Sequence, residues 1–126
     1  STVDRLIDQF PAEQQQQIRT MLAAALKGVV AQILLKKKGG GRVAALEVLV
    51  VTPAVASLIR DAKTSQIMSI MQTAKKEGMT LINEELTRLV KEDIVEAEEA
   101  YRKATDKEGF VKSLEAAGII YKHGDE

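Results

Sequence analysis

The sequence has no cysteine or tryptophan, and aromatic residues make up only 3% of its 126 residues. Without cysteine the chain can form neither a disulfide framework nor a thiolate metal site. It has a single histidine, His123, next to Asp125 and Glu126 near the carboxy terminus. One imidazole is a weak basis for a metal site or a Ser–His–acid arrangement, and we expect a tail there. These absences exclude most catalytic chemistry that depends on cysteine or histidine.

The chain also lacks an excess of charge of either sign. Its 18 basic and 18 acidic residues cancel, so nothing indicates the basic surface of a nucleic-acid-binding protein. The longest apolar run, Val43–Val51, is too short to cross a bilayer, and we expect no transmembrane segment. The sequence opens on Ser1 without a methionine, which favours a processed or truncated protein.

The first part of the chain has the spacing of two helices. Apolar residues predict a short helix over residues 2–9 and a second helix that begins at Pro11. The second helix has a broad apolar stripe, made of Ile18, Met21, Leu22, Ala25, Leu26 and Val29.

Two strands follow, joined by a glycine turn. Ile33–Leu35 leads into Lys36–Lys38 and Gly39–Gly41, and a second strand covers Arg42–Val51. This second strand is apolar almost throughout, which is typical of a strand covered on both faces of an α/β sheet. The chain offers only two strands, so we expect the others to come from elsewhere.

Glu47 is the one charge inside this apolar strand, and its burial without a partner would be costly. Arg42 falls on the opposite strand face, so any partner comes from a neighbouring element. We favour a structural ion pair over a catalytic role.

The rest of the chain reads as helices. Thr52 and Pro53 start a helix that reaches Arg60, by a hydroxyl cap followed by a preset φ. After a break at Asp61–Lys63, further helices are predicted from a Thr64 or Ser65 cap, over Thr80–Lys91, over Glu96–Lys103, and from a Thr105–Glu108 capping box to Gly118.

The charged residues show no catalytic pattern. The glycine cluster before Arg42 lacks the Lys-Ser/Thr end of a P-loop. Its lysines could touch a phosphate or a lipid headgroup, although an exposed hairpin loop is the favoured interpretation. Carboxylates on the later helices alternate with basic residues, as on solvated helix faces. We expect no catalytic, cofactor-binding or metal-binding residue in this chain.

Several blocks together resemble one family, the type IV pilus retraction ATPases, or PilT-type twitching motility motors. They are RLIDQFPAEQQQQIRTMLAAALKGVVAQILL from Arg5, GRVAALEVLVVTPA from Gly41 and TSQIMSIMQTAKKEGM from Thr64. The resemblance implies an α/β fold: the C-terminal part of a RecA-like ATPase core, with one strand pair and a mainly helical C-terminal region. Related secretion and pilus-assembly ATPases usually carry four cysteines in this part, so their absence favours the retraction branch.

The resemblance also implies a motor motif in the helix after Thr52. The family's A-I-R-N-L-I-R-E motif, implicated in retraction, matches Ala54, Val55, Ala56, Ser57, Leu58, Ile59, Arg60 and Asp61. Leu58, Ile59 and Arg60 agree with the motif and Asp61 keeps the acid, whereas Ala56 and Ser57 replace arginine and asparagine. An ordinary amphipathic helix packed on the sheet is the alternative.

The function implied is that of a fragment of a homo-hexameric ATPase that powers pilus retraction. ATP and Mg belong to the parent protein, whose nucleotide motifs would precede Ser1, so this fragment would be inactive and bind no cofactor alone. The implied partners are other copies and an inner-membrane pilus platform protein, with no nucleic acid. The implied location is cytoplasmic, peripheral at the inner membrane.

We expect three regions: the edge of the ATPase core (1–51), a helical region (52–118) and a tail (119–126). A free-standing helical protein-interaction module without enzymatic activity is the alternative from another class.

Overall fold

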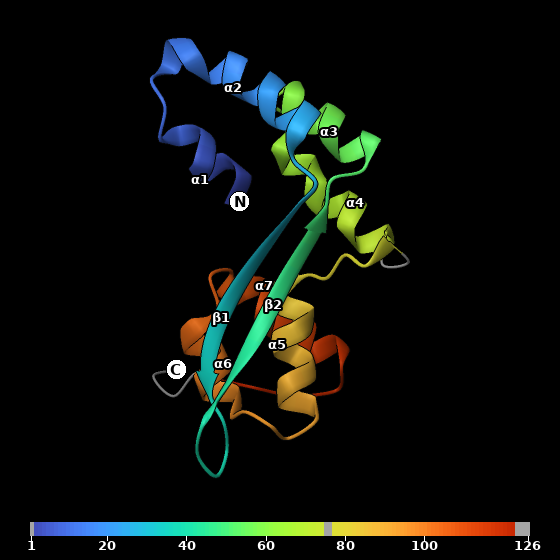
Figure 1. The fold of residues 1–126 in the computed structure, drawn as a ribbon. Coiled ribbons are helices and arrows are strands. Elements are labelled where there is room, and N and C mark those ends of the chain that lie inside the picture. Colours follow the sequence, from blue (N-terminus) through green and yellow to red (C-terminus); the bar gives the residue numbers. More distant parts are fainter. Residues whose placement is uncertain (1, 75–76, 123–126) are drawn as a thin grey trace. The chain divides into compact units, whose positions relative to one another are not determined.

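The computed structural model describes residues 2–74 and 77–122, so His123 and the two acids after it lie outside the described residues. The elements, in chain order, are α1 (Thr2–Asp8), α2 (Ala12–Ala25), β1 (Gly28–Lys36), β2 (Arg42–Val50), α3 (Pro53–Arg60), the 3-10 turn η1 (Thr64–Gln66), α4 (Ile67–Thr73), α5 (Ile82–Lys91), α6 (Ala97–Lys103) and α7 (Lys107–Ala116) (Figure 1). The two strands form an antiparallel pair, which confirms the predicted α/β class with one strand pair and several helices.

The chain divides into two compact units. Unit 1 holds the residues up to Ala31 together with Val48–Thr80, and unit 2 holds Gln32–Glu47 and the residues from Leu81 onward. In unit 1, α3 packs against α2, and the buried apolar side chains include Val3, Ile7, Val55, Ile59, Met71 and Met79. In unit 2, α5, α6 and α7 pack together around one core, made of Leu35, Ala45, Leu86, Leu89, Val95, Ala100, Ala104, Phe110 and Leu114.

The strand pair begins earlier than the apolar pattern predicted. Helix α2 ends at Ala25, and Leu26 already has an extended ψ of 128°. Val29, which the pattern assigned to the helix, lies in β1, so that prediction was wrong. The physical reason is that β-branched valines after Gly28 favour an extended backbone over another helical turn.

Two backbone hydrogen bonds set the register of the pair. The Lys37 N–H donates to the Gly41 carbonyl at 2.9 Å, and the Val51 N–H donates to the Lys27 carbonyl at 3.0 Å. The tip is the predicted glycine turn, with φ of 82°, 112° and 80° at Gly39, Gly40 and Gly41. Three successive positive φ values suit only glycine, so the position of this turn is encoded locally.

Apolar side chains on both strands remain exposed, although the pattern of β2 predicts burial on both faces. Ala45 and Leu49 of β2 are buried, whereas Leu46 is exposed. On β1, Val30 and Leu34 are exposed as well. That further strands from elsewhere cover these residues stays a prediction.

The structure confirms one of the three helix caps that the sequence predicted. The Thr52 hydroxyl accepts from the Val55 N–H at 3.3 Å, and Pro53 starts α3, as predicted. Thr64 caps nothing; its hydroxyl donates to Asp4 at 2.7 Å, and α4 begins after η1 without a side-chain cap. Helix α7 is capped by Asp106 instead of Thr105, with an accepted bond of 3.1 Å from the Gly109 N–H. Aspartate is the stronger N-cap residue, which explains the one-residue shift.

Glu47 has a structural partner, but of a different kind from the one expected. Its carboxylate accepts a hydrogen bond of 3.1 Å from the Ile82 N–H, at the start of α5. No cation pairs with it among the described residues, and the partner found there is this backbone N–H. The free N–H groups and partial positive charge of a helix amino terminus satisfy a carboxylate without a side-chain cation.

Candidate functional site

The predicted motor motif lies almost entirely on α3, in unit 1. Val55 and Ile59 are fully buried and lie one helical turn apart on α3, which packs against α2. Ala54, Arg60 and Asp61 are exposed, whereas Ala56, Ser57 and Leu58 are partly buried. The helix therefore presents a small polar end to its surroundings and holds it in place through two buried aliphatic side chains.

Helix α3 ends in a Schellman motif. The Lys63 N–H donates to the Leu58 carbonyl at 2.8 Å, and the Ala62 N–H donates to the Ile59 carbonyl at 3.3 Å. Ala62 has φ of 59°, in the left-handed region where glycine normally sits. The sequence contained no glycine here to signal the motif, so only the structure shows how the helix ends.

Three polar side chains of the motif meet at this end. The Arg60 guanidinium donates to the Ser57 hydroxyl at 3.4 Å and lies 3.7 Å from the Asp61 carboxylate. The Ser57 hydroxyl donates to Asp61 at 3.5 Å. About half of the Arg60 and Asp61 side chains is exposed, 52% and 50%. Exposed pairs of this kind contribute little to stability, so the group orients Arg60 more than it holds the fold.

A residue that the sequence did not single out ties α2 to this end. The Gln16 side-chain amide donates to the Arg60 carbonyl at 3.0 Å, across 44 positions of chain. Gln16 is one of four consecutive glutamines, and nothing in the run distinguishes it. The contact fixes the carboxyl end of α3 against α2.

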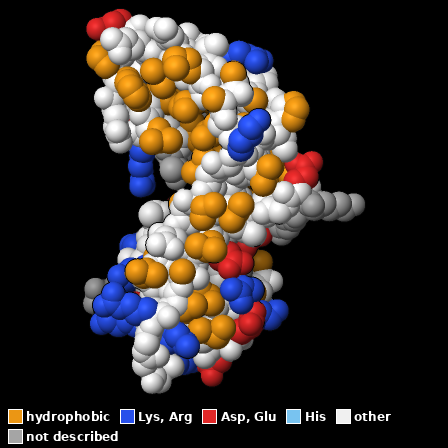
Figure 2. Space-filling model, viewed as in Figure 1, with side chains coloured by type: hydrophobic (Ala, Val, Ile, Leu, Met, Phe, Trp, Pro, Cys, Tyr) orange, Lys and Arg blue, Asp and Glu red, His pale blue; other side chains and the backbone are white. Residues whose placement is uncertain are grey.

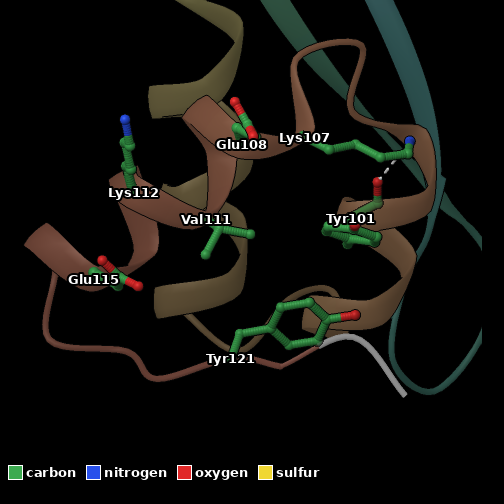
Figure 3. A pocket seen from close by; sticks show the side chains of 7 residues that line it. All are labelled: Tyr101, Lys107, Glu108, Val111, Lys112, Glu115 and Tyr121. Carbon is green, nitrogen blue, oxygen red and sulfur yellow. Dashed lines mark hydrogen bonds between the residues drawn. The ribbon is translucent and has the colours of Figure 1, made fainter. Parts of the chain in front are cut away.

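Unit 2 contains a groove of about 380 Å³ between α6, α7 and the segment after α7 (Figure 3). It is lined by Tyr101, Lys107, Glu108, Val111, Lys112, Glu115 and Tyr121. The rings of Tyr101 and Tyr121 lie 5.4 Å apart at 43°, and the Tyr121 hydroxyl donates to Glu98. Burial and the Glu98 carboxylate raise the pKa of Tyr121 above its usual range.

Lys107, the lysine that lies over the Tyr101 ring, already has hydrogen-bond partners within the protein. Lys107 donates to the carbonyls of Tyr101, Arg102 and Ala104 at 2.8–3.1 Å, where α6 ends. Among residues 2–74 and 77–122, no group of three or more His, Asp or Glu side chains could hold a metal ion. The groove therefore has the character of a packed helix junction, with Tyr121 attaching the last described residues to it.

Glu99, on α6, is a buried acid in the same unit. Its carboxylate accepts from the Lys36 N–H at 2.8 Å and from the Arg102 guanidinium at 2.6 Å. The Lys36 hydrogen bond is the main cause that lowers the pKa of Glu99; burial opposes it and Arg102 adds to it. Sequence reasoning grouped Glu99 with the solvated helix acids, and only the fold shows its role in holding β1.

Searches against known proteins identify the relatives of this chain. No protein-family model matches it. It is 43% identical over 109 residues to the type IV pilus retraction ATPase PilT of Pseudomonas aeruginosa, covering 86% of this chain and 32% of that protein. It is also 43% identical over 110 residues to a twitching motility protein of Neisseria gonorrhoeae, covering 86% of this chain and 29% of that protein.

The structure agrees with these sequences. A solved structure of the pilus retraction motor PilT with bound ADP superposes with a TM-score of 0.77 at 36% identity, covering 88% of this chain and 31% of that one. The chain thus spans about a third of the length of the relatives it matches. Among the described residues, no helix is both long and apolar enough to cross a membrane. The resemblance of the sequence blocks is confirmed, and the chain belongs, as a carboxy-terminal part, to the PilT-type family of type IV pilus retraction ATPases.

Proposed function

We propose that this chain is the carboxy-terminal part of a hexameric ATPase motor that powers type IV pilus retraction and twitching motility. The observation that carries the proposal is the 43% identity to a pilus retraction ATPase across 86% of the chain. ATP and Mg would bind to a part of the motor outside these residues, and the chain alone would hydrolyse no ATP. The ADP held by the related motor PilT supports nucleotide binding by the longer protein.

The role proposed for α3 is to pass a nucleotide-dependent movement to a neighbour. Its apolar face is anchored by Val55 and Ile59, so the helix moves with unit 1 as a rigid piece. Its exposed end presents Arg60, with Ser57 and Asp61 orienting the guanidinium. A guanidinium offers a planar fork of donors that can exchange one carboxylate partner for another. Two alternative partners would give the two states that a coupling element requires.

The proposed division of labour follows the expected regions. Residues 1–51 would complete an edge of the ATPase core, 52–118 would form the coupling region, and 119–126 would be a tail. The exposed apolar side chains of β1 and β2 support this division, because an ATPase core in the longer protein would cover them. The motor would work in the cytoplasm at the inner membrane, against a pilus platform protein.

The test is a pair of matched arginine variants in the full-length protein. Arg60→Ala removes the proposed coupling group, whereas Arg88→Ala removes an exposed arginine of α5 that pairs with Glu85 and Glu92. The expected result is loss of twitching with Arg60→Ala, with ATP hydrolysis retained, and near-normal twitching with Arg88→Ala. Twitching zones and ATPase rates are measured on the same strains.

Equal twitching by the two variants would remove α3 from the mechanism. A full-length protein that hydrolyses no ATP would overturn the motor assignment itself. In that case the alternative, a helical protein-interaction module without enzymatic activity, would take its place.

A further inference from the structure

The tip of the β1–β2 hairpin carries a dense group of cations around an open glycine turn. Lys36, Lys37, Lys38 and Arg42 are all exposed. At Gly39, Gly40 and Gly41, nothing lies within 4 Å of the place where a Cβ would sit. We call these seven residues, 36–42, the basic tip. Its centre has no side chains, so a flat surface can approach the flanking cations closely.

The strand end that carries the basic tip is held firmly by unit 2. The Lys36 N–H donates to Glu99, and the Lys38 N–H donates to the Ile94 carbonyl at 2.9 Å. The Lys38 ammonium pairs with Asp93, which raises the pKa of Lys38. These contacts hold the backbone of the strand end that carries the cations.

The nearby acids are already occupied, which leaves the tip positive. Glu99 is shared by the Lys36 N–H and Arg102, and Asp93 is taken by Lys38. The charge of Glu96 also helps to raise the pKa of Lys38, after the effects of Asp93. Among the described residues, no carboxylate forms an ion pair with the side chains of Lys36, Lys37 or Arg42. Figure 2 shows lysine and arginine side chains at several places on this face of unit 2, with aspartate and glutamate side chains among them.

We propose that the basic tip is a contact site for the phosphate headgroups of an anionic lipid bilayer. Neighbouring strands lie about 4.8 Å apart, so cations on both strands can reach adjacent headgroup phosphates. Each lysine or arginine near an anionic membrane surface strengthens binding by about five-fold. The inference rests on the proposed function only in that a motor at the inner membrane would meet such a surface.

The composition of the tip favours a lipid surface over nucleic acid. Proteins that bind single strands stack bases on aromatic rings, and no aromatic residue occurs between Phe10 and Tyr101. The chain as a whole has no net charge, so the attraction is local and short-ranged.

The experiment measures binding of the full-length protein to vesicles. One set contains a third of phosphatidylglycerol in phosphatidylcholine, and the other contains phosphatidylcholine alone. The test variant is Lys37→Gln with Arg42→Gln, and the matched control is Lys91→Gln with Lys112→Gln, two lysines that are exposed elsewhere in unit 2. We expect the test variant to bind anionic vesicles about 25-fold more weakly and the control to bind like the unsubstituted protein.

Four results would overturn the proposal, and the first three concern vesicles and free phosphate. These three are equal binding to neutral and anionic vesicles, equal weakening by the control, and displacement by excess inorganic phosphate at unchanged ionic strength, which would indicate a site for free phosphate. Single-stranded oligonucleotide that competes with vesicles through the same two residues would likewise replace lipid by nucleic acid. ATPase rates without vesicles, measured on the same variants, keep a failure of the tip distinct from a failure of the motor assignment.

Discussion

The two units differ in how completely they bury their apolar side chains. Unit 2 places Phe110, Tyr101 and Tyr121 around one continuous core. Unit 1 has Phe10 as its one aromatic residue, and that side chain is 41% exposed. Of the eight large apolar side chains that are exposed among the described residues, five belong to unit 1: Leu6, Phe10, Met21, Val30 and Met68.

The difference shows which part of the chain forms a closed hydrophobic core from its own side chains. Large rings cover more surface than alanine or methionine, so unit 2 closes its core with its own side chains. Unit 1 contains the alanine-rich end of α2, which supplies no residue that is fully buried. Unit 1 also carries the proposed coupling helix, which is consistent with a surface that meets other parts of a longer protein.

The largest effect should come from emptying the core of unit 2. Phe110→Ala removes a fully buried ring and should lower the free energy of unfolding by about 3–5 kcal/mol. Phe10→Ala in unit 1 makes the same change at an exposed site and should cost about 1 kcal/mol or less. Urea unfolding measures both, followed by tyrosine fluorescence for unit 2 and by far-ultraviolet circular dichroism for the helices of the whole chain. Equal losses of unfolding free energy in the two variants would show that the two units do not differ in core burial.

The next effect concerns the start of α5 in unit 2. Glu47→Ala leaves the Ile82 N–H without its acceptor and should cost about 1–3 kcal/mol. Glu47→Gln keeps an acceptor oxygen and should recover part of this loss. Hydrogen exchange at the Ile82 amide reports the contact directly. Unchanged exchange in Glu47→Ala would show that the carboxylate is dispensable.

The carboxyl ends of two helices, one in each unit, allow the same structural feature to be tested in both. Helices α3 and α7 both end in a Schellman motif, with Ala62 at φ 59° in one and Gly118 at φ 82° in the other. Gly118→Ala should cost about 1–2 kcal/mol, because alanine is strained in the left-handed region. Ala62→Gly should add up to about 1 kcal/mol by the same argument reversed. Thermal melts of the two variants should therefore shift in opposite directions; shifts of the same sign would refute the strain at Ala62.

A smaller effect should appear at low pH in unit 2. Because the folded pKa of Glu99 lies below its ordinary value of 4.5, its contribution is present above pH 4.5 and is lost as the pH falls through the lower folded value. Glu99→Gln should cost about 1 kcal/mol at neutral pH and flatten the pH dependence of stability below pH 4.5. Urea midpoints between neutral pH and about pH 3 measure it. An unchanged acid slope in the variant would exclude Glu99 as its source.

The smallest effect on stability should come from the coupling helix. Arg60→Ala should change the free energy of unfolding by less than about 0.5 kcal/mol, because the guanidinium is half exposed and its ion pair is long. Loss of twitching in a variant of unchanged stability would then be a functional effect. A loss of several kcal/mol would mean that Arg60 acts by holding the fold.

Local signals in the sequence predicted local structure well. The Thr52 hydroxyl and Pro53 mark the start of α3, and the glycines at 39–41 mark the hairpin turn. Signals that compete over one or two residues were misjudged, as with Asp106 against Thr105 and Val29 against the end of α2. In each case two neighbouring residues could play the same part, and small differences in capping or β-propensity decided between them.

The sequence by itself determined the α/β class, the strand pair, the helix that carries the proposed motif and the family. These depend on short-range preferences and on blocks of residues that can be recognised in order. Only the tertiary structure decided that Glu47 meets the start of α5, 35 positions later, and that Glu99 holds Lys36 across 63 positions. The same holds for the division into two units, because a carboxylate's partner depends on which distant N–H groups the fold leaves within hydrogen-bond reach.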